Sequence, residues 1–377
     1  MPELDSPLTE RRKQTRNRIF RYIYGFPDGC SKNDIARDLN LSLPTVYQNI
    51  TELMDAGLIA YGGYKGSSGG RPASMIQPVY NVRTAVGVCL SCRDLRFAAT
   101  DLSGTETGYK SVPLRFPSEI EEIFRFMTAQ LEQFLDEFHI DRSTLIGVGI
   151  TFPGIIDESA SHLLYAPTLG IKNVSLDGLI ESIPYTVHIE NDATAGGLAE
   201  IYNSEVRRNI AFLSLFEGVG GSLIVDGELY RGANNRSGEF GHMCVENGGR
   251  PCTCGRSGCL EAYCSPRRLR DDLNLTFEEF FSSLEAGNPV CRDAWEQFES
   301  HLAIGIHNLR MAFDSEVVLG GELSGYLAAH LPELRSRVAA LDPFSEDVSY
   351  LSVSRYSRYS SMLGAALYFI KEFMDNI

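Results

Sequence analysis

A change of sequence pattern near residue 84 restricts the fold of this chain more than any other feature. Before it, three short stretches carry apolar residues at helical spacing and end at turn-forming residues. After it, short apolar stretches typical of strands alternate with helical patterns through two successive cycles. In the second cycle, a turn over Gly218–Gly221 is expected between strands at residues 210–216 and 222–225. The pattern predicts a small helical head followed by an α/β body, in which two lobes enclose a ligand cleft.

The head is predicted to contain three helices within residues 9–75. The first spans residues 11–24, where arginines precede an apolar stripe. The second follows Ser31 and Asp34, which form a variant of the capping box, and the third follows the capping residue Ser42. A tight turn separates the last two helices, which is the arrangement of a helix-turn-helix.

The third helix has one apolar stripe, at Val46, Ile50 and Leu53, and we expect this stripe to face inward. Its outward face is expected to present the hydrogen-bonding residues Thr45, Tyr47, Gln48, Asn49 and Thr51. Such side chains read base edges in the major groove of DNA. A short strand and a glycine-rich loop follow, and the loop carries Lys65 and Arg71, which can meet phosphate or enter a minor groove. We interpret the head as a winged helix-turn-helix that binds DNA; a helical docking domain is the alternative.

The charge of the chain is consistent with this division. The net charge is −15, but residues 1–75 hold 10 Lys+Arg against 8 Asp+Glu, so the rest of the chain carries −17. A mildly basic head on an acidic body is typical of a head that meets nucleic acid. The first residues are polar and no run of eighteen apolar residues occurs. We therefore expect a cytoplasmic protein without membrane insertion.

Five of the nine cysteines fall within 21 residues of the body: Cys244, Cys252, Cys254, Cys259 and Cys264. In a reducing compartment, clustered cysteines indicate metal binding before disulfides. With His242, the three central cysteines form a Cys3His set, a closed tetrahedral arrangement for Zn²⁺. We predict a structural zinc ion with the ligands His242, Cys252, Cys254 and Cys259, while the two outer cysteines are the less favoured ligands.

The body also carries four motifs in a characteristic order. They read Gly147-Val-Gly149-Ile-Thr-Phe-Pro153-Gly154, Glu190-Asn191-Asp192-Ala193, Ser237-Gly238-Glu239-Phe-Gly241-His242 and Cys252-x-Cys254-Gly-x-x-Gly-Cys259-Leu-Glu261. These motifs resemble the signatures of the ROK family (repressors, open reading frames and kinases) over residues 84–370. The head, with Ser68-Gly-Gly-Arg71-Pro72 in its loop, is similar to the heads of the glucose-type and xylose-type repressors of that family.

The resemblance implies an α/β, actin/hexokinase-like pair of lobes behind the winged helix-turn-helix. Residues 82–195 and the C-terminal helix 361–377 would form the first lobe, and residues 196–360 the second lobe with the zinc site. It also implies a hexose-type pocket built from Asn191, Asp192, Glu239, His242 and Glu261. Carboxylates and amides can bind sugar hydroxyls in pairs, and His242 could bind zinc while it positions Glu239. A role as helix cap is the alternative explanation for Asp192.

In the sugar kinases of the family, the residue matching Asp192 would be the general base. Phosphoryl transfer also needs loops that hold the ATP phosphates and magnesium. The kinase loop Asp-x-Gly-Gly-Thr is replaced here by residues 89–94, Cys-Leu-Ser-Cys-Arg-Asp, and the Gly-Thr-Gly loop by Phe216-Glu217-Gly218. The loss of both phosphate loops predicts a protein that is not an enzyme.

These features predict a sugar-responsive DNA-binding transcriptional regulator, and we expect a repressor. It would bind a mono- or disaccharide effector without phosphorylating it. As a homodimer or tetramer, it would bind a pseudo-palindromic DNA operator. The alternative is a ROK sugar kinase with an appended regulatory DNA-binding head. Relatives controlled by transport-system proteins leave a regulatory protein partner open.

Overall fold

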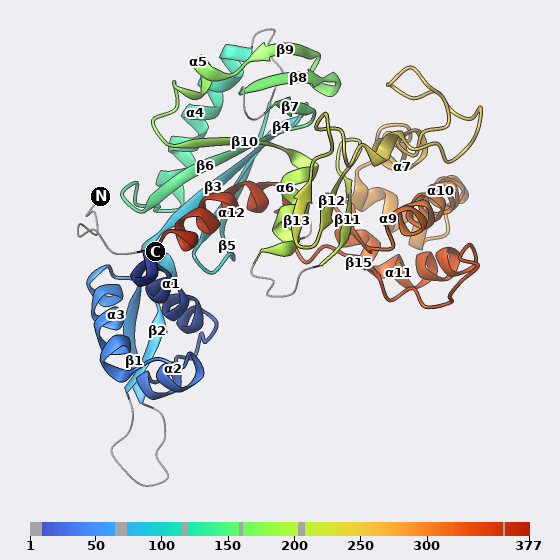
Figure 1. The fold of residues 1–377 in the computed structure, drawn as a ribbon. Helices are drawn as coiled ribbons and strands as arrows, with labels where there is room; N and C mark the ends of the chain where they lie inside the picture. Colours follow the sequence, from blue (N-terminus) through green and yellow to red (C-terminus); the bar gives the residue numbers. More distant parts are fainter. Residues whose placement is uncertain (1–9, 65–73, 115–119, 158–160, 203–207, 357–358) are drawn as a thin grey trace.

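The computed structural model describes residues 10–64, 74–114, 120–157, 161–202, 208–356 and 359–377 (Figure 1). A small head is joined to a body that contains two five-stranded sheets. None of the described helices combines the length and the apolar character needed to cross a membrane. The expected α/β body behind a winged helix-turn-helix is confirmed.

The head consists of three helices and a two-stranded sheet. They are α1 (Glu10–Tyr24), α2 (Lys32–Asp38), α3 (Leu43–Asp55), β1 (Ile59–Tyr64) and β2 (Ser74–Pro78). Ser31 and Asp34 form the expected capping box, and the Ser42 side chain accepts from the Thr45 backbone N–H. Apolar residues of all three helices and of both strands form one buried core. The sequence pattern did not predict β2, which completes the hairpin by pairing antiparallel with β1.

The first sheet of the body has the strand order β10-β6-β3-β4-β5. Its strands are β3 (Thr84–Leu90), β4 (Asp94–Asp101), β5 (Glu106–Pro113), β6 (Leu145–Phe152) and β10 (Val187–Asn191). Helix α4 (Ile120–Glu137) covers one face, where Phe97 packs against Phe134. The C-terminal helix α12 (Ser360–Asp375) covers the other face, close to the strands because Gly87 and Gly149 leave room for its backbone.

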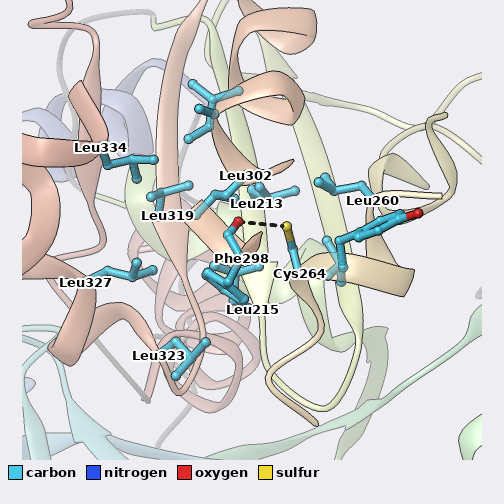
Figure 2. Close-up of a cluster of buried hydrophobic side chains, with 14 of the residues drawn as sticks. Leu213, Leu215, Leu260, Cys264, Phe298, Leu302, Leu319, Leu323, Leu327 and Leu334 are labelled. Carbon is cyan, nitrogen blue, oxygen red and sulfur yellow. Dashed lines mark hydrogen bonds between the residues drawn. The ribbon is translucent and has the colours of Figure 1, made fainter. Parts of the chain in front are cut away.

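The second sheet has the order β13-β12-β11-β14-β15. Its strands are β11 (Ile210–Leu215), β12 (Val219–Val225), β13 (Glu228–Tyr230), β14 (Glu316–Gly320) and β15 (Leu351–Val353). The helices of this half are α7 (Glu261–Cys264), α8 (Arg267–Arg270), α9 (Phe277–Glu285), α10 (Pro289–Phe313) and α11 (Ser324–Ala339). Figure 2 shows leucines of β11, β14, α10 and α11 packed in one buried core. Cys264 lies in this core and its Sγ donates to the Phe298 carbonyl at 3.5 Å.

Helix α6 (Asp192–Ile201) follows β10 directly and packs between the sheets against α12 and β12. The contact with α12 is close: a Cβ atom on Gly364 would lie 1.7 Å from the Ala195 carbonyl oxygen. Smaller elements complete the body: β7 (Ile155–Asp157), β8 (His162–Ala166), β9 (Ile171–Ser175), α5 (Asp177–Ile180) and the 3-10 turns Tyr80–Val82, Pro167–Leu169 and Phe240–His242.

The structure corrects one predicted turn. The sequence pattern placed a turn over Gly218–Gly221, but β12 already begins at Val219. Leu215 and Val219 are paired across the antiparallel strands, so the connection consists of Phe216, Glu217 and Gly218. Glycines in β12 gave the impression of a turn, whereas Gly221 in fact makes room for the Phe240 ring.

The head is attached to the body through α1 and the end of α12. Arg21 forms an ion pair with Asp375, and the Asn17 side chain donates to the Met374 carbonyl. The hydroxyl of Tyr24 donates to the Leu102 carbonyl, which also accepts from Tyr202 at the end of α6. Apolar residues of the head and of α12 belong to one buried cluster. The joint therefore links the head to α12 and to α6.

Candidate functional site

The candidate metal site lies in the loop between β13 and α7. The ligand atoms of His242, Cys252, Cys254 and Cys259 all lie within 4.8 Å of one another. Cys254 Sγ lies 3.7 Å from Cys259 Sγ, and Cys252 Sγ lies 3.7 Å from His242 Nδ1. Two thiolates on a tetrahedral zinc ion are about 3.8 Å apart, given Zn–S bonds of about 2.3 Å. We call these four side chains, His242, Cys252, Cys254 and Cys259, the metal-type cluster. The cluster could bind a metal ion, and its donors are those that zinc prefers.

The loop around this cluster folds tightly because of its glycines. Gly255 and Gly258 have φ angles of 85° and 80°, which favour glycine. A Cβ atom on Gly258 would also lie 1.7 Å from the Glu246 carbonyl oxygen. Cys244 is exposed and Cys264 is buried in the core, and neither belongs to the cluster of donors.

A cavity of about 330 Å³ lies between the two sheets. The structure brings together on its wall all five residues expected to bind sugar: Asn191, Asp192, Glu239, His242 and Glu261. The first two begin helix α6, His242 is a member of the candidate metal site, and the two glutamates lie beside that site. Polar groups from both halves of the body therefore face one space, which is an arrangement suited to a small polyhydroxylated ligand.

Asn191 and Asp192 have different roles at the start of α6. The Asn191 side chain is the helix cap, since its Oδ1 accepts from the N–H groups of Ala193 and Thr194 at 3.0 and 2.9 Å. Its Nδ2 donates to the Gly154 carbonyl at 2.8 Å and so ties α6 to the first sheet. Asp192 Oδ1 accepts from the Ala193 N–H at 2.9 Å. Burial raises the pKa of Asp192 to about 7, and the nearby Glu239 carboxylate adds to this rise.

Glu261 joins the candidate metal site to the cavity. Its Oε1 accepts from the Thr253 hydroxyl at 2.9 Å, and Thr253 stands between two of the clustered cysteines. Its Oε2 accepts from the Val219 N–H at 3.2 Å. A Cβ atom on Gly218 would lie 2.6 Å from Glu261 Oε2, so a side chain at residue 218 would displace this carboxylate. His242 Nε2 lies 3.9 Å from Glu239 Oε2, so the metal-type cluster lies beside both carboxylates.

One of the two positions expected for phosphate loops, residues 216–218, holds a buried aromatic ring and a buried carboxylate. The side chain of Phe216 is buried. The guanidinium carbon of Arg96 lies over its ring, 4.7 Å from the ring centroid. Glu217 is 2 % exposed and is surrounded by arginines. The connection between β11 and β12 therefore presents a buried carboxylate paired with arginines. It differs in this from a glycine-rich loop, whose backbone N–H groups bind phosphate.

Helix α3 exposes most, but not all, of the residues expected to contact DNA. Tyr47, Gln48 and Thr51 are exposed, and Thr45 is half-buried. The prediction for Asn49 on this face is wrong: its side chain is 2 % exposed and donates to the Thr45 carbonyl at 2.8 Å. Asn49 follows Val46 by three residues, so helical geometry places it on the buried stripe. Lys65 and Arg71 lie outside the described residues.

Sequence reasoning missed one cation on this surface. Lys32 Nζ lies 4.0 Å from the centroid of the Tyr47 ring and donates to the Tyr61 hydroxyl at 3.0 Å. It thereby places a positive charge beside α3 and β1. Its position at the start of α2 gave no signal, because the contact joins three elements.

Comparison with known proteins matches both parts of the chain to families. The model of the ROK family matches residues 86–372, and a model of winged helix-turn-helix DNA-binding domains matches residues 12–60. The chain is 27% identical to the xylose repressor of Bacillus subtilis over 361 residues, which cover 92% of both chains. It is 26% identical over 326 residues to the DNA-binding transcriptional dual regulator NagC of Escherichia coli, covering 81% of this chain and 80% of NagC.

Solved structures show the same fold. A ROK family transcriptional regulator described as a homolog of the E. coli MLC protein matches with a TM-score of 0.73 and 22% identity, over 98% of both chains. A ROK family glucokinase from Streptomyces griseus matches with a TM-score of 0.66 and 21% identity, over 76% of this chain and 98% of the kinase. Because the family model covers well over half of the residues and a second model covers the head, the chain belongs to the ROK family, with a winged helix-turn-helix in front of its ROK domain.

Proposed function

We propose that this protein is a sugar-responsive transcriptional repressor that binds a mono- or disaccharide without phosphorylating it. One observation carries the proposal: the chain combines a DNA-binding head with a cavity lined by five side chains of the kind that bind sugar hydroxyls. The relative named xylose repressor supports it, because that match covers 92% of both chains and so extends beyond the ROK domain. NagC, which is named a DNA-binding transcriptional regulator, is a second relative that supports it. The matching glucokinase covers only 76% of this chain.

The head would bind a pseudo-palindromic operator in a homodimer or tetramer. Thr45, Tyr47, Gln48 and Thr51 are the proposed base readers, with Lys65 and Arg71 on the wing. A repressor of this kind works in the cytoplasm, where its operator is, and a regulatory protein partner is compatible with the proposal.

The metal-type cluster would hold a structural Zn²⁺ through His242, Cys252, Cys254 and Cys259. Four protein donors leave no open position for water, so the ion would stabilise the loop and not activate a nucleophile. Through Thr253 and His242, this loop contacts Glu261 and Glu239. We propose that the zinc site keeps these two carboxylates in register at the cavity, as outer contacts of metal ligands often do.

The same geometry supports the proposal that the protein does not phosphorylate its sugar. Asp192 could take a proton, because its pKa of about 7 suits a general base. Transfer of a phosphoryl group also needs preorganised positive charge or N–H groups for ATP. The buried Phe216 and Glu217 side chains stand at one of the two positions that would supply them.

A path for the sugar response runs through α6. Its first residues, Asn191 and Asp192, line the cavity, and its last turn reaches Tyr202 at the joint with the head. The Leu102 carbonyl accepts hydrogen bonds from the hydroxyls of both Tyr202 and Tyr24. A sugar that draws the lobes together would bias this joint, provided that its affinity differs between the DNA-competent and incompetent states.

The test is a thermal-shift screen of D-xylose, D-glucose, N-acetylglucosamine and disaccharides, because a bound ligand raises the unfolding temperature by mass action. A sugar that stabilises the protein is then added to a gel-shift assay with the DNA upstream of the gene, and a change of DNA affinity is expected. An assay of ADP release with the same sugar must stay at background. ADP release that disappears in the Asp192→Asn variant would support the kinase alternative. DNA affinity that stays unchanged with every stabilising sugar would refute the repressor proposal.

A further inference from the structure

A group of ionised side chains connects the two sheets beside the sugar cavity. We call it the interlobe cluster, and it consists of four arginines and four carboxylates: Arg93, Arg96, Arg267, Arg270, Asp94, Glu217, Asp271 and Glu322. Two arginines and Asp94 come from β4 and the turn before it, and the others come from the half built on the second sheet. Apart from Glu217, its members have no role in the function proposed above.

Glu217 is the centre of this cluster. Its carboxylate lies 3.2 Å from Arg93 Nε, 3.1 Å from Arg270 Nη2 and 3.6 Å from Arg267 Nε. A carboxylate that is almost fully buried is stable only with strong compensation by opposite charge. Three guanidinium groups converging on one carboxylate provide this compensation.

Further ion pairs cross between the two halves. Arg93 Nη2 lies 2.5 Å from Asp271, and Arg96 Nη2 lies 3.4 Å from Glu322. Arg270 links these two ion pairs, because it contacts both of their carboxylates: Asp271 at 3.0 Å and Glu322 at 3.6 Å. Arg96 is only 8 % exposed on its side chain, so this part of the cluster is shielded from solvent.

The backbone at Glu217 belongs to the wall of the sugar cavity. The Ser265 hydroxyl donates to the Glu217 carbonyl at 3.0 Å and fixes the connection between β11 and β12. Two residues later, the Val219 N–H donates to Glu261, a proposed sugar ligand. A movement of Glu217 toward or away from Arg93 would therefore change both the angle of the lobes and the position of Glu261.

We propose that Glu217 is an internal counter-ion that holds the two lobes together over the sugar cavity, which makes it a positioning residue for the effector. The effect on sugar rests on the proposed function, whereas the counter-ion role does not. Within the described chain, Arg267 has no second carboxylate in ion-pair contact. Removal of the Glu217 charge would therefore leave an arginine-lined site that attracts an anion such as a phosphate ester or pyrophosphate.

The first experiment measures this gain of anion binding. Inorganic pyrophosphate is titrated against the full-length wild-type protein and the Glu217→Ala and Glu217→Gln variants at ionic strength matched with NaCl, and binding is followed by calorimetry. We expect saturable binding at least tenfold tighter in the variants than in the wild type. Adding Arg270→Ala to Glu217→Ala should reverse the gain. Destabilisation alone cannot create a binding site, so equal pyrophosphate affinity in wild type and both variants would overturn the counter-ion role.

The second experiment measures sugar affinity with the sugar found in the thermal-shift screen. Glu217→Gln is expected to weaken sugar binding about tenfold, and Arg93→Ala, at a side chain that is 43 % exposed, is expected to weaken it as well without loss of folding. Unchanged sugar affinity in both variants would overturn the positioning role. If no sugar binds the wild-type protein, the proposed function fails, but the pyrophosphate result still decides the counter-ion role.

Discussion

The metal-type cluster and the interlobe cluster support the same cavity in different ways. The donors of the first lie within residues 242–259, in one half of the body. The charges of the second come from β4 with the turn before it and from three separate segments of the other half. One cluster fixes the shape of a loop and the other fixes how two halves meet. The comparison teaches that the position of Glu261 depends both on local chain closure and on the angle between the lobes.

The largest expected effect follows from breaking the metal-type cluster. Cys259→Ala should release the metal, unfold the loop and abolish the sugar response, because zinc binding supplies about 10–16 kcal/mol to small zinc-binding peptides. Metal content and thermal unfolding measure this. Cys244→Ala is the matched control, since Cys244 is exposed and outside the cluster. Equal losses in both variants would contradict the assignment of ligands.

A smaller effect is expected from breaking the interlobe cluster. Arg96→Ala removes the arginine partner of Asp94, leaves Glu322 paired with Arg270 alone among the described residues and uncovers the ring of Phe216. Removal of one partner from a buried ion pair costs about 3–5 kcal/mol. Urea unfolding measures this loss, with Arg37→Ala as control because Arg37 pairs at the surface. A loss below that of the control would show that the cluster does not stabilise the lobes.

The same contrast between local and long-range contacts extends to the head. Gln48→Ala should cost about 1–3 kcal/mol of operator discrimination, if this exposed side chain reads a base, and should leave stability unchanged. Asn49→Ala should instead lower stability, because Asn49 is buried and bonded to its own helix. Gel shifts on operator and scrambled DNA, together with thermal unfolding, separate the two effects. The opposite pattern would restore Asn49 as a reader.

The smallest effect concerns pH at the cavity. The pKa of Asp192 is raised to about 7 in the folded protein, so its carboxyl is protonated below this pH and ionised above it. An ionised carboxylate accepts two sugar hydroxyls, and sugar affinity should therefore rise with pH by up to about tenfold per unit until pH 7 and then level off. Stability should change in the opposite sense, falling from about pH 4 to pH 7, because only the folded state keeps the proton.

Calorimetry with the identified sugar between pH 5.5 and 8.5 checks this, with Asp192→Asn as the variant that removes the titration. Glu239 also faces the cavity, so a pH dependence that persists in Asp192→Asn would assign the effect to Glu239 instead.

Features that depend on short stretches of chain were open to sequence reasoning. The capping box of Ser31 and Asp34 needs residues three apart, and the cysteine spacing of the metal-type cluster fits within one loop. The prediction that Asn49 is exposed is wrong, although its spacing from Val46 already favours the buried stripe. The prediction gave more weight to the polar side chain of Asn49 than to its position on the helix. Strand β2 was missed because its few residues are stable only when paired with β1.

The sequence by itself determined the head and the α/β body, because helical period and motif spacing act over a few residues. The residues that gather at the cavity were implied by the resemblance of its motifs to those of the ROK family. Only the tertiary structure decided that α6 connects the cavity to the joint at Leu102, and that Glu217 has Arg93, Arg267 and Arg270 as partners. The physical reason is that the charge of a buried carboxylate must be balanced by neighbours in space. Those neighbours lie up to 124 residues away along the chain, where no local pattern records them.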